Sequence, residues 1–197
     1  MKIGIIPSIK ELYKDQYEYT CDIRLVKFVK KIFKNHSINI LNHESKINKE
    51  YKLIIISGGN NLYNFSSKKK IDTVRIRLNE KFYRVSIKYK IPILGICFGA
   101  QFLASKFNST FKRKKHTKNH FVKIVGRKKL LLVNSYHNII ISRLGNNLLN
   151  KGFSVDDNSI ELFSHPKKKL LGIMWHPERY KKNKLIDIKL IKDLVCT

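Results

Sequence analysis

The chain has 197 residues, 43% of them hydrophobic, and this length and composition predict a globular protein with a substantial core. We therefore expect one domain over residues 1–197. No run approaches the ~20 apolar residues of a membrane-spanning helix, and the opening MKIGIIPSIK lacks a signal-peptide cleavage site. We expect a cytoplasmic protein without membrane contact.

Three widely spaced cysteines, Cys21, Cys97 and Cys196, argue against a disulfide framework or a cysteine-based zinc site.

The chain is strongly basic, with 41 Lys and Arg against 14 Asp and Glu and a formal net charge of +27. Such an excess is typical of proteins that bind nucleic acid by neutralising its phosphates. The lysines, however, are spread along the whole chain rather than gathered in one helix or tail, which favours a solvated basic surface. We expect no specific nucleic-acid partner, although a nucleotide or phosphorylated substrate would be attracted to this charge.

In the first half of the chain, apolar segments of strand length alternate with helical patterns. Strands are predicted at residues 2–6, 38–41, 53–57 and 93–96. Helices are predicted at 21–33 and from near Ser66 to the residues before Pro92, because apolar residues recur there at helical spacing beside lysines. Gly58 and Gly59 follow the third of these strands directly. Alternating strands and helices predict a mostly parallel sheet flanked by helices.

The second half has a different pattern from about residue 118 onward. Short strand candidates are separated by turns: HFVKIV, KLLLVNSYH, IIIS, FSVDD, SIELFSH and KLLGIMW. The final segment, LIDIKLIKDLV, predicts a helix. We therefore predict an α/β fold with a β-rich section in its C-terminal half. Ligands of open α/β sheets bind beyond the carboxyl ends of the strands, where Gly58, Gly59 and Cys97 fall.

Cys97 stands between a short apolar strand and a helical segment in the stretch ILGICFGAQFLA. The pattern G-x-C-x-G, with Gly95 and Gly99, is the thiol version of a nucleophile elbow. A tight strand-to-helix turn needs small neighbours, and the N-terminus of the following helix favours a thiolate. Cys97 is therefore a candidate nucleophile. A buried cysteine beside packing glycines is the alternative that this motif alone leaves open.

A second motif supplies the base that a nucleophilic cysteine needs. The strand in LLGIMWHPER delivers His176 at its end, and Glu178 follows after Pro177. His176 can take the Cys97 proton and return it to a leaving nitrogen, while Glu178 orients the imidazole. We expect Cys97, His176 and Glu178 to converge at the carboxyl edge of the sheet.

Taken together, G-I-C-x-G-x-Q, a strand ending in Gly-Gly and a C-terminal W-H-P-E resemble the class I glutamine amidotransferase superfamily, over nearly the whole chain. The resemblance implies a flavodoxin-like core and a Cys-His-Glu triad acting through a glutamyl-thioester. SGGNNL, VNSYHN, SIELF and GIMWHPER are most similar to its γ-glutamyl hydrolase branch, peptidase family C26. YEYTCDIRL and SGGNNL resemble a subgroup of capsule phosphoramidate pathways that hydrolyses γ-glutamyl nucleotide amidates. Asn61, Cys21 and Phe98 depart from that subgroup's usual residues.

The resemblance also implies roles for further residues and for the partners of the chain. The backbone N–H groups of Gly59 and Phe98 would form an oxyanion hole. Six residues would contact substrate: Gly58, Asn60, Gln101, Ser135, Tyr136 and His137. For Ser135, Tyr136 and His137, a plain turn between strands remains the alternative. The expected substrate is a small γ-glutamyl amide, with a nucleotide-linked one as the first candidate, and no cofactor is expected.

Two weaker signals concern histidines and the single tryptophan. His116 and His120 are four residues apart in KRKKHTKNH, but no acidic or cysteine partner stands near them in the sequence. We expect an exposed basic loop at the rim of the site and no metal. Trp175 is expected in the core.

Two other functions compete with hydrolysis by the chain alone. A glutaminase subunit would pass ammonia to a synthase partner, and it would show weak activity that the partner stimulates. A nucleic-acid or scaffold-binding domain would use the basic surface and leave the cysteine motif idle. The presence of both motifs favours the enzyme.

Overall fold

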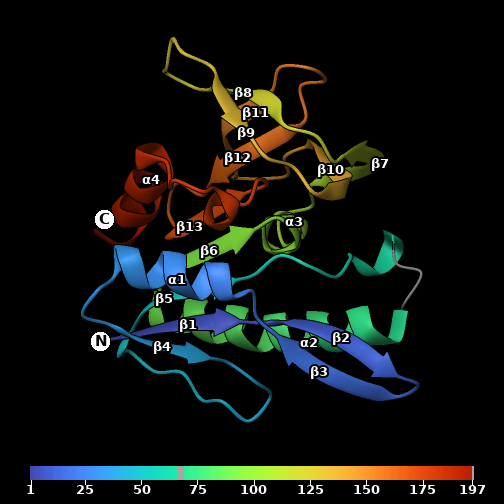
Figure 1. The fold of residues 1–197 in the computed structure, drawn as a ribbon, viewed down its shortest axis with the longest axis vertical. Coiled ribbons are helices and arrows are strands. Elements are labelled where there is room, and N and C mark those ends of the chain that lie inside the picture. The colour runs from blue at the N-terminus through green and yellow to red at the C-terminus, as the bar shows by residue number, and fades with distance from the viewer. Residues whose placement is uncertain (66–68, 197) are drawn as a thin grey trace.

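Most strands of the protein join one large sheet. The computed structural model describes residues 1–65 and 69–196, and in these residues eleven strands form that sheet (Figure 1). One half of it is parallel, in the order β4 (Ser37–Ile40), β1 (Lys2–Ile6), β5 (Tyr51–Ile56), β6 (Ile93–Ile96) and β13 (Leu170–Ile173). The central strands are almost continuously apolar, as expected of parallel strands covered on both faces.

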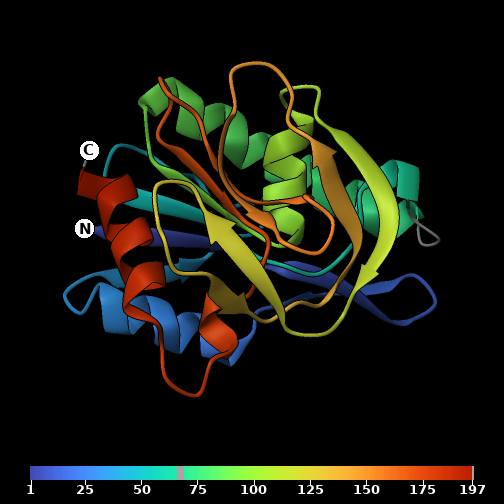
Figure 2. The same cartoon turned by 90° about the horizontal axis from the view of Figure 1, so that it is seen from above.

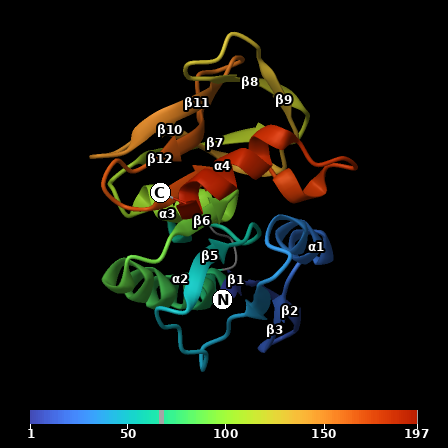
Figure 3. The same cartoon turned by 90° about the vertical axis from the view of Figure 1, so that its left-hand side faces the viewer.

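The other half of the sheet is antiparallel and lies beyond β13 (Figure 3). It contains β12 (Ile160–Ser164), β11 (Leu149–Ser154), β8 (His120–Ile124) and β9 (Leu131–Val133), joined by β10 (His137–Arg143) and β7 (Thr110–His116). β10 pairs with both β12 and β7. The predicted mostly parallel α/β sheet with a β-rich C-terminal section is therefore confirmed.

Four α-helices of the described residues cover the two faces of the parallel half. They are α1 (Ile23–Ile32), α2 (Lys69–Tyr89), α3 (Phe98–Ser105) and α4 (Leu185–Cys196). Figure 2 shows α1 and α4 on one side of the sheet and α2 and α3 on the other. The predicted start of α2 near Ser66 lies outside the described residues. None of the helices in the described part is long and apolar enough to cross a membrane.

The core divides between these two faces because side chains of a strand alternate in direction. Ile54 of β5 packs with Phe82 of α2 and Phe102 of α3 on one face. On the other face, Ile55 of β5 packs with Phe28 of α1. Trp175 is fully buried in the second cluster, which confirms its predicted place in the core.

A hairpin that the sequence did not predict extends from the carboxyl end of β1. It consists of β2 (Ser8–Tyr13) and β3 (Gln16–Thr20), which form a separate two-stranded sheet. The side chain of Asn60 holds this hairpin to the loop after β5: its Oδ1 accepts from the Ile9 N–H at 3.0 Å, and its Nδ2 donates to the Ile9 carbonyl at 2.9 Å.

Candidate active site

The carboxyl ends of β5, β6 and β13 lie side by side because these strands are parallel neighbours. Gly58 and Gly59 follow β5, Cys97 follows β6, and His176 comes shortly after β13. A cleft of about 150 Å³ opens at this edge. Of the residues predicted to form a site, those lining the cleft are Gly59, Asn60, Cys97, Phe98, Gln101, Tyr136, His137 and His176. Gly58, Ser135 and Glu178 are not among the residues that line it.

Cys97 occupies the sharp turn that the sequence predicts between β6 and α3. Its backbone has φ 52° and ψ −108°, a conformation that costs a non-glycine residue about 1–3 kcal/mol. Its N–H donates to the Ile173 carbonyl at 2.8 Å, which ties the turn to β13. Gly99 lets α3 approach the sheet, because a Cβ there would lie 2.1 Å from the Ile56 carbonyl oxygen. The thiol is thereby presented at the N-terminus of α3.

His176 and Glu178 form a buried pair beside this thiol. The Nδ1 of His176 lies 2.6 Å from Oε1 of Glu178, and both residues are more than nine-tenths buried. Gly58 lets the loop after β5 pass close to these groups, because a Cβ on it would lie 2.6 Å from Cε1 of His176 and 3.4 Å from Cβ of Cys97. The carboxylate holds Nδ1, which leaves Nε2 as the nitrogen available for proton transfer.

The charge state of His176 follows from its neighbours. Burial opposes the charged imidazole, but the charge and hydrogen bond of Cys97, followed by those of Glu178, outweigh burial and raise the pKa of His176 to about 9. A protonated imidazole is therefore favoured at neutral pH. An imidazolium beside a thiolate is the activated form of a cysteine nucleophile.

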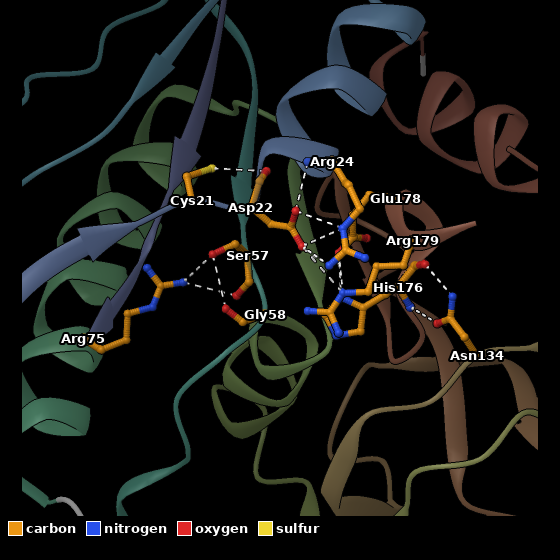
Figure 4. A network of polar contacts seen from close by, with 10 residues as sticks. All are labelled: Cys21, Asp22, Arg24, Ser57, Gly58, Arg75, Asn134, His176, Glu178 and Arg179. Carbon is orange, nitrogen blue, oxygen red and sulfur yellow. Dashed lines mark hydrogen bonds and ion pairs between the residues drawn. The ribbon is translucent and has the colours of Figure 1, made fainter. Parts of the chain in front are cut away.

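Asn134 positions His176, and the sequence analysis did not single it out. Its Oδ1 accepts from the His176 N–H at 2.8 Å, and its Nδ2 donates to the His176 carbonyl at 2.9 Å (Figure 4). This two-point contact fixes the backbone that carries the imidazole. The only sequence signal is an asparagine directly before the predicted segment 135–137, which by itself also suits an ordinary turn.

Arg179 lines the cleft and is another residue that sequence reasoning missed. Its guanidinium lies over the Tyr136 ring, 4.6 Å from the ring centre, and its Nε is 3.7 Å from both Oε1 of Glu178 and Oδ2 of Asp22. Tyr136 in turn meets the His176 ring edge-on, with the ring centres 5.6 Å apart. Arg179 thus places a positive charge at the cleft and packs the aromatic ring that covers His176.

The remaining predicted contact residues are held in place by hydrogen bonds. Nε2 of Gln101 donates to the Ile139 carbonyl at 2.9 Å, and Oγ of Ser135 donates to the His116 carbonyl at 2.6 Å. The side chain of Asn60 is engaged by Ile9, so only its backbone is available to a ligand in this structure. The His137 side chain is buried against Glu161.

The prediction that His116 and His120 lie in an exposed basic loop without an acidic partner was wrong. His116 ends strand β7 and His120 begins β8, and both are largely buried rather than part of an exposed basic loop. An acidic partner does stand nearby: the Glu161 carboxylate lies 3.7 Å from Nδ1 of His116 and 3.5 Å from Nε2 of His120. The sequence did not indicate this partner, because Glu161 belongs to β12 and is distant from both histidines in the chain.

Comparison with known proteins gives a consistent result. The chain matches the family model of the class-I glutamine amidotransferases over residues 11–192. A γ-glutamyl-CDP-amidate hydrolase from Campylobacter jejuni subsp. jejuni serotype O:2 is 36% identical over 171 residues, which cover 84% of this chain and 82% of that protein. Anthranilate synthase component 2 from Saccharolobus solfataricus is 27% identical over 107 residues, covering 47% of this chain and 55% of that protein.

A solved structure also resembles this fold. A glutamine amidotransferase from Thermotoga maritima superposes with a TM-score of 0.68 and 20% sequence identity, covering 98% of this chain and 82% of that one. At this identity the likeness concerns the fold alone.

Proposed function

Because the chain belongs to the class I glutamine amidotransferases, we propose that it is a cysteine hydrolase that cleaves a γ-glutamyl amide bond and releases glutamate. The observation that carries this proposal is the cleft in which Cys97, on a strained turn, meets the buried pair of His176 and Glu178. A thiolate and an imidazolium held together at the carboxyl edge of a sheet suit acyl transfer.

The reaction has two stages. The Cys97 thiolate attacks the γ-carbonyl carbon of the substrate, the C–N bond breaks, and the leaving nitrogen takes the proton of His176. The product of this stage is a γ-glutamyl thioester. His176, now neutral, then removes a proton from water, the resulting hydroxide attacks the thioester carbonyl, and the C–S bond breaks. Glutamate leaves, and the thiolate and imidazolium are restored.

Backbone N–H groups of Gly59 and Phe98 stabilise the oxyanion of both stages in this proposal. Both residues line the cleft with Cys97. Gly59 has φ +84°, a conformation that glycine adopts without strain. Gln101, Tyr136 and the backbone of the segment 135–137 hold the glutamyl group, with Gly58 supporting the loop beneath it.

A γ-glutamyl nucleotide amidate is the substrate that we propose, with γ-glutamyl-CDP-amidate as its best candidate. Support comes from the 36% identity to a hydrolase of that name. Arg179 at the cleft and the net charge of +27 suit an anionic diphosphate. Three free cysteines, one of them the nucleophile, suit the reducing cytoplasm that we propose as its location.

A glutaminase subunit is the second candidate, favoured by the similarity to anthranilate synthase component 2. The two functions differ in what the purified chain does alone. We expect it to release glutamate from γ-glutamyl amides without any added protein, as followed by an enzyme-coupled glutamate assay. Release that appears only after a synthase is added would favour the second candidate instead.

Glu178→Gln should lower kcat by about 10²- to 10⁴-fold, because the imidazole loses its orienting carboxylate while nucleophile and base remain. It should also change the pH profile. The Glu178 charge helps to raise the pKa of His176 to about 9, so its removal lowers that pKa, and the imidazolium is lost at a lower pH. The alkaline limb of kcat/KM, which reports the free enzyme, should therefore move to lower pH.

A matched control for this variant is Glu50→Gln, which removes an exposed carboxylate paired with Lys2 at the opposite edge of the sheet. Its kcat and its alkaline limb should match those of the wild type. An unchanged limb in Glu178→Gln would contradict the assignment of Glu178 as the residue that positions and charges His176.

A further inference from the structure

Three histidines surround one carboxylate next to the catalytic cleft, and of these four residues only His137 lines the cleft. His116 at the end of β7, His120 at the start of β8 and His137 at the start of β10 converge on Glu161 of β12. Four strands of the antiparallel half thus contribute one side chain each. The ring centre of His116 lies 5.1 Å from that of His120 and 5.2 Å from that of His137.

Most polar atoms of this cluster are buried and have no hydrogen-bond partner in the described part of the chain. Glu161 is fully buried, and neither of its carboxylate oxygens has a hydrogen-bond partner in the described part of the chain. The same holds there for Nε2 of His120 and for both ring nitrogens of His137. Burying a carboxylate without partners destabilises the folded protein by roughly several kcal/mol. Such a group therefore calls for an explanation, such as a bound ion.

The distances within the cluster fit a bound metal better than hydrogen bonds. Oε1 of Glu161 lies 3.7 Å from Nδ1 of His116, 3.5 Å from Nε2 of His120 and 3.6 Å from Nε2 of His137. All three separations exceed normal hydrogen-bond lengths. Ligand atoms about 2.0–2.1 Å from a tetrahedral zinc ion are roughly 3.3–3.4 Å apart, so each of the three separations from Glu161 needs only a small contraction to match such a site.

A carboxylate outside the cluster fixes the ring of His116. Nε2 of His116 lies 3.0 Å from Oδ2 of Asp157, which also pairs with Lys114 at 2.9 Å. With Nε2 held by this carboxylate, Nδ1 of His116 is directed at Glu161. Histidine ligands of metals almost always donate their second nitrogen to such a partner, which sets the tautomer and the ring orientation.

We propose that His116, His120 and Glu161, joined by His137 as the fourth ligand, bind a structural Zn²⁺ ion. The ligand atoms of the first three all lie within 4.8 Å of one another. Three imidazoles and one carboxylate are typical zinc donors, and four protein ligands close the coordination sphere. A surface cleft of about 440 Å³, lined by residues 115–120 and Asp156, provides a path of entry.

The zinc site goes beyond the proposed hydrolysis and connects to it through the backbone. Ser135 donates to the carbonyl of His116, and His137 begins β10, so the ion fixes both ends of the segment 135–137. Tyr136 and His137 line the catalytic cleft. Zinc would therefore rigidify the segment that we propose to hold the glutamyl group, without contacting the reacting atoms.

The test measures zinc rather than activity, so its failure is distinguishable from failure of the proposed function. The chain is purified without a polyhistidine tag and dialysed against metal-free buffer, and its zinc is counted by plasma mass spectrometry. We expect about one zinc per chain, a rise in Tm when Zn²⁺ is restored to chelator-treated protein, and tetrahedral Co²⁺ absorption on cobalt substitution. Less than a tenth of an equivalent, together with no Tm response to Zn²⁺, would overturn the proposal.

Variants locate the ion within the chain. His120→Asn and Glu161→Gln should each bind at least tenfold less zinc, whereas His36→Asn, a histidine outside the cluster, should keep the full amount. Loss in all three would place the zinc elsewhere and contradict the assignment. Should a cluster variant fail to fold, the cobalt spectrum of the wild type still decides: a tetrahedral band supports the site, and its absence counts against it.

A metal-free alternative predicts different behaviour in the same experiments. The Glu161 carboxylate raises the pKa of His116, so without zinc the cluster would be held by protonated histidine. Its stabilisation would be present at acidic pH and lost as the pH rises through the raised pKa. With zinc, stability instead falls towards acidic pH as protons displace the ion from its ligands. A Tm that rises on acidification and ignores both chelator and Zn²⁺ would contradict our proposal.

Discussion

Cys97→Ala is expected to abolish the release of glutamate from γ-glutamyl amides, with kcat reduced by at least about 10⁴-fold. The reason is that the thiolate forms the new covalent bond, and neither His176 nor Glu178 can replace it. Cys97→Ser should lose nearly as much, because a hydroxyl is far harder to deprotonate than a thiol. The effect is measured by glutamate release at saturating substrate, with enzyme concentrations high enough to detect the residual rate.

The fold should survive the substitution. Alanine is smaller than cysteine, and the hydrogen bond from the backbone N–H of residue 97 to Ile173 remains available. Circular dichroism and Tm close to those of the wild type would show this. Cys196→Ala, at an exposed position in α4, is the matched control and should keep full activity. Activity of Cys97→Ala within tenfold of the wild type would contradict the role of Cys97 as nucleophile.

The second large effect concerns the substrate. We expect kcat/KM for γ-glutamyl-CDP-amidate to exceed that for L-glutamine by several orders of magnitude, each tenfold step corresponding to about 1.4 kcal/mol. Both substrates present the same glutamyl group to the cleft, but only the first carries a nucleotide whose binding energy can be used in the transition state. Arg179 and the basic surface are the expected contacts of its phosphates.

The dependence of kcat/KM on ionic strength distinguishes recognition of the charged nucleotide from a general preference for larger substrates. Raising the ionic strength screens attraction between exposed charges, so kcat/KM for the anionic nucleotide amidate should fall more than kcat/KM for glutamine. Comparable kcat/KM values for the two substrates at low salt would contradict the nucleotide amidate as substrate. The same result would leave the cysteine mechanism itself unaffected.

Much of the parallel half of the fold could be predicted from the sequence. Strands such as β5 and β6 are short apolar runs followed by glycine or a G-x-C-x-G turn. The apolar run and the turn that follows it are both visible in the local sequence. The positions of Cys97 and His176 at strand ends follow from the same runs. Parallel pairing then brings those ends together at one edge of the sheet, whatever the length of chain between them.

The features that were missed depend on contacts between distant segments. The hairpin of β2 and β3 is largely exposed and polar, so its residues carry little of the apolar pattern that marks a strand. Asn134 acts on His176 across 42 residues of sequence. Glu161 reaches His116 only because β10 pairs with both β7 and β12, a topology that no local pattern encodes.

The central claim is that Cys97 carries the γ-glutamyl group during catalysis. The most direct measurement is acid quenching of the enzyme during turnover of γ-glutamyl-CDP-amidate, followed by tryptic digestion and mass spectrometry. Glu178→Gln can be used alongside the wild type, because slower deacylation should let the intermediate accumulate. The tryptic peptide 91–106 contains Cys97 and no other cysteine. The account predicts one added glutamyl group on this peptide, at Cys97. A glutamyl group on a different residue, or an unmodified peptide in both proteins while glutamate is being released, would contradict it.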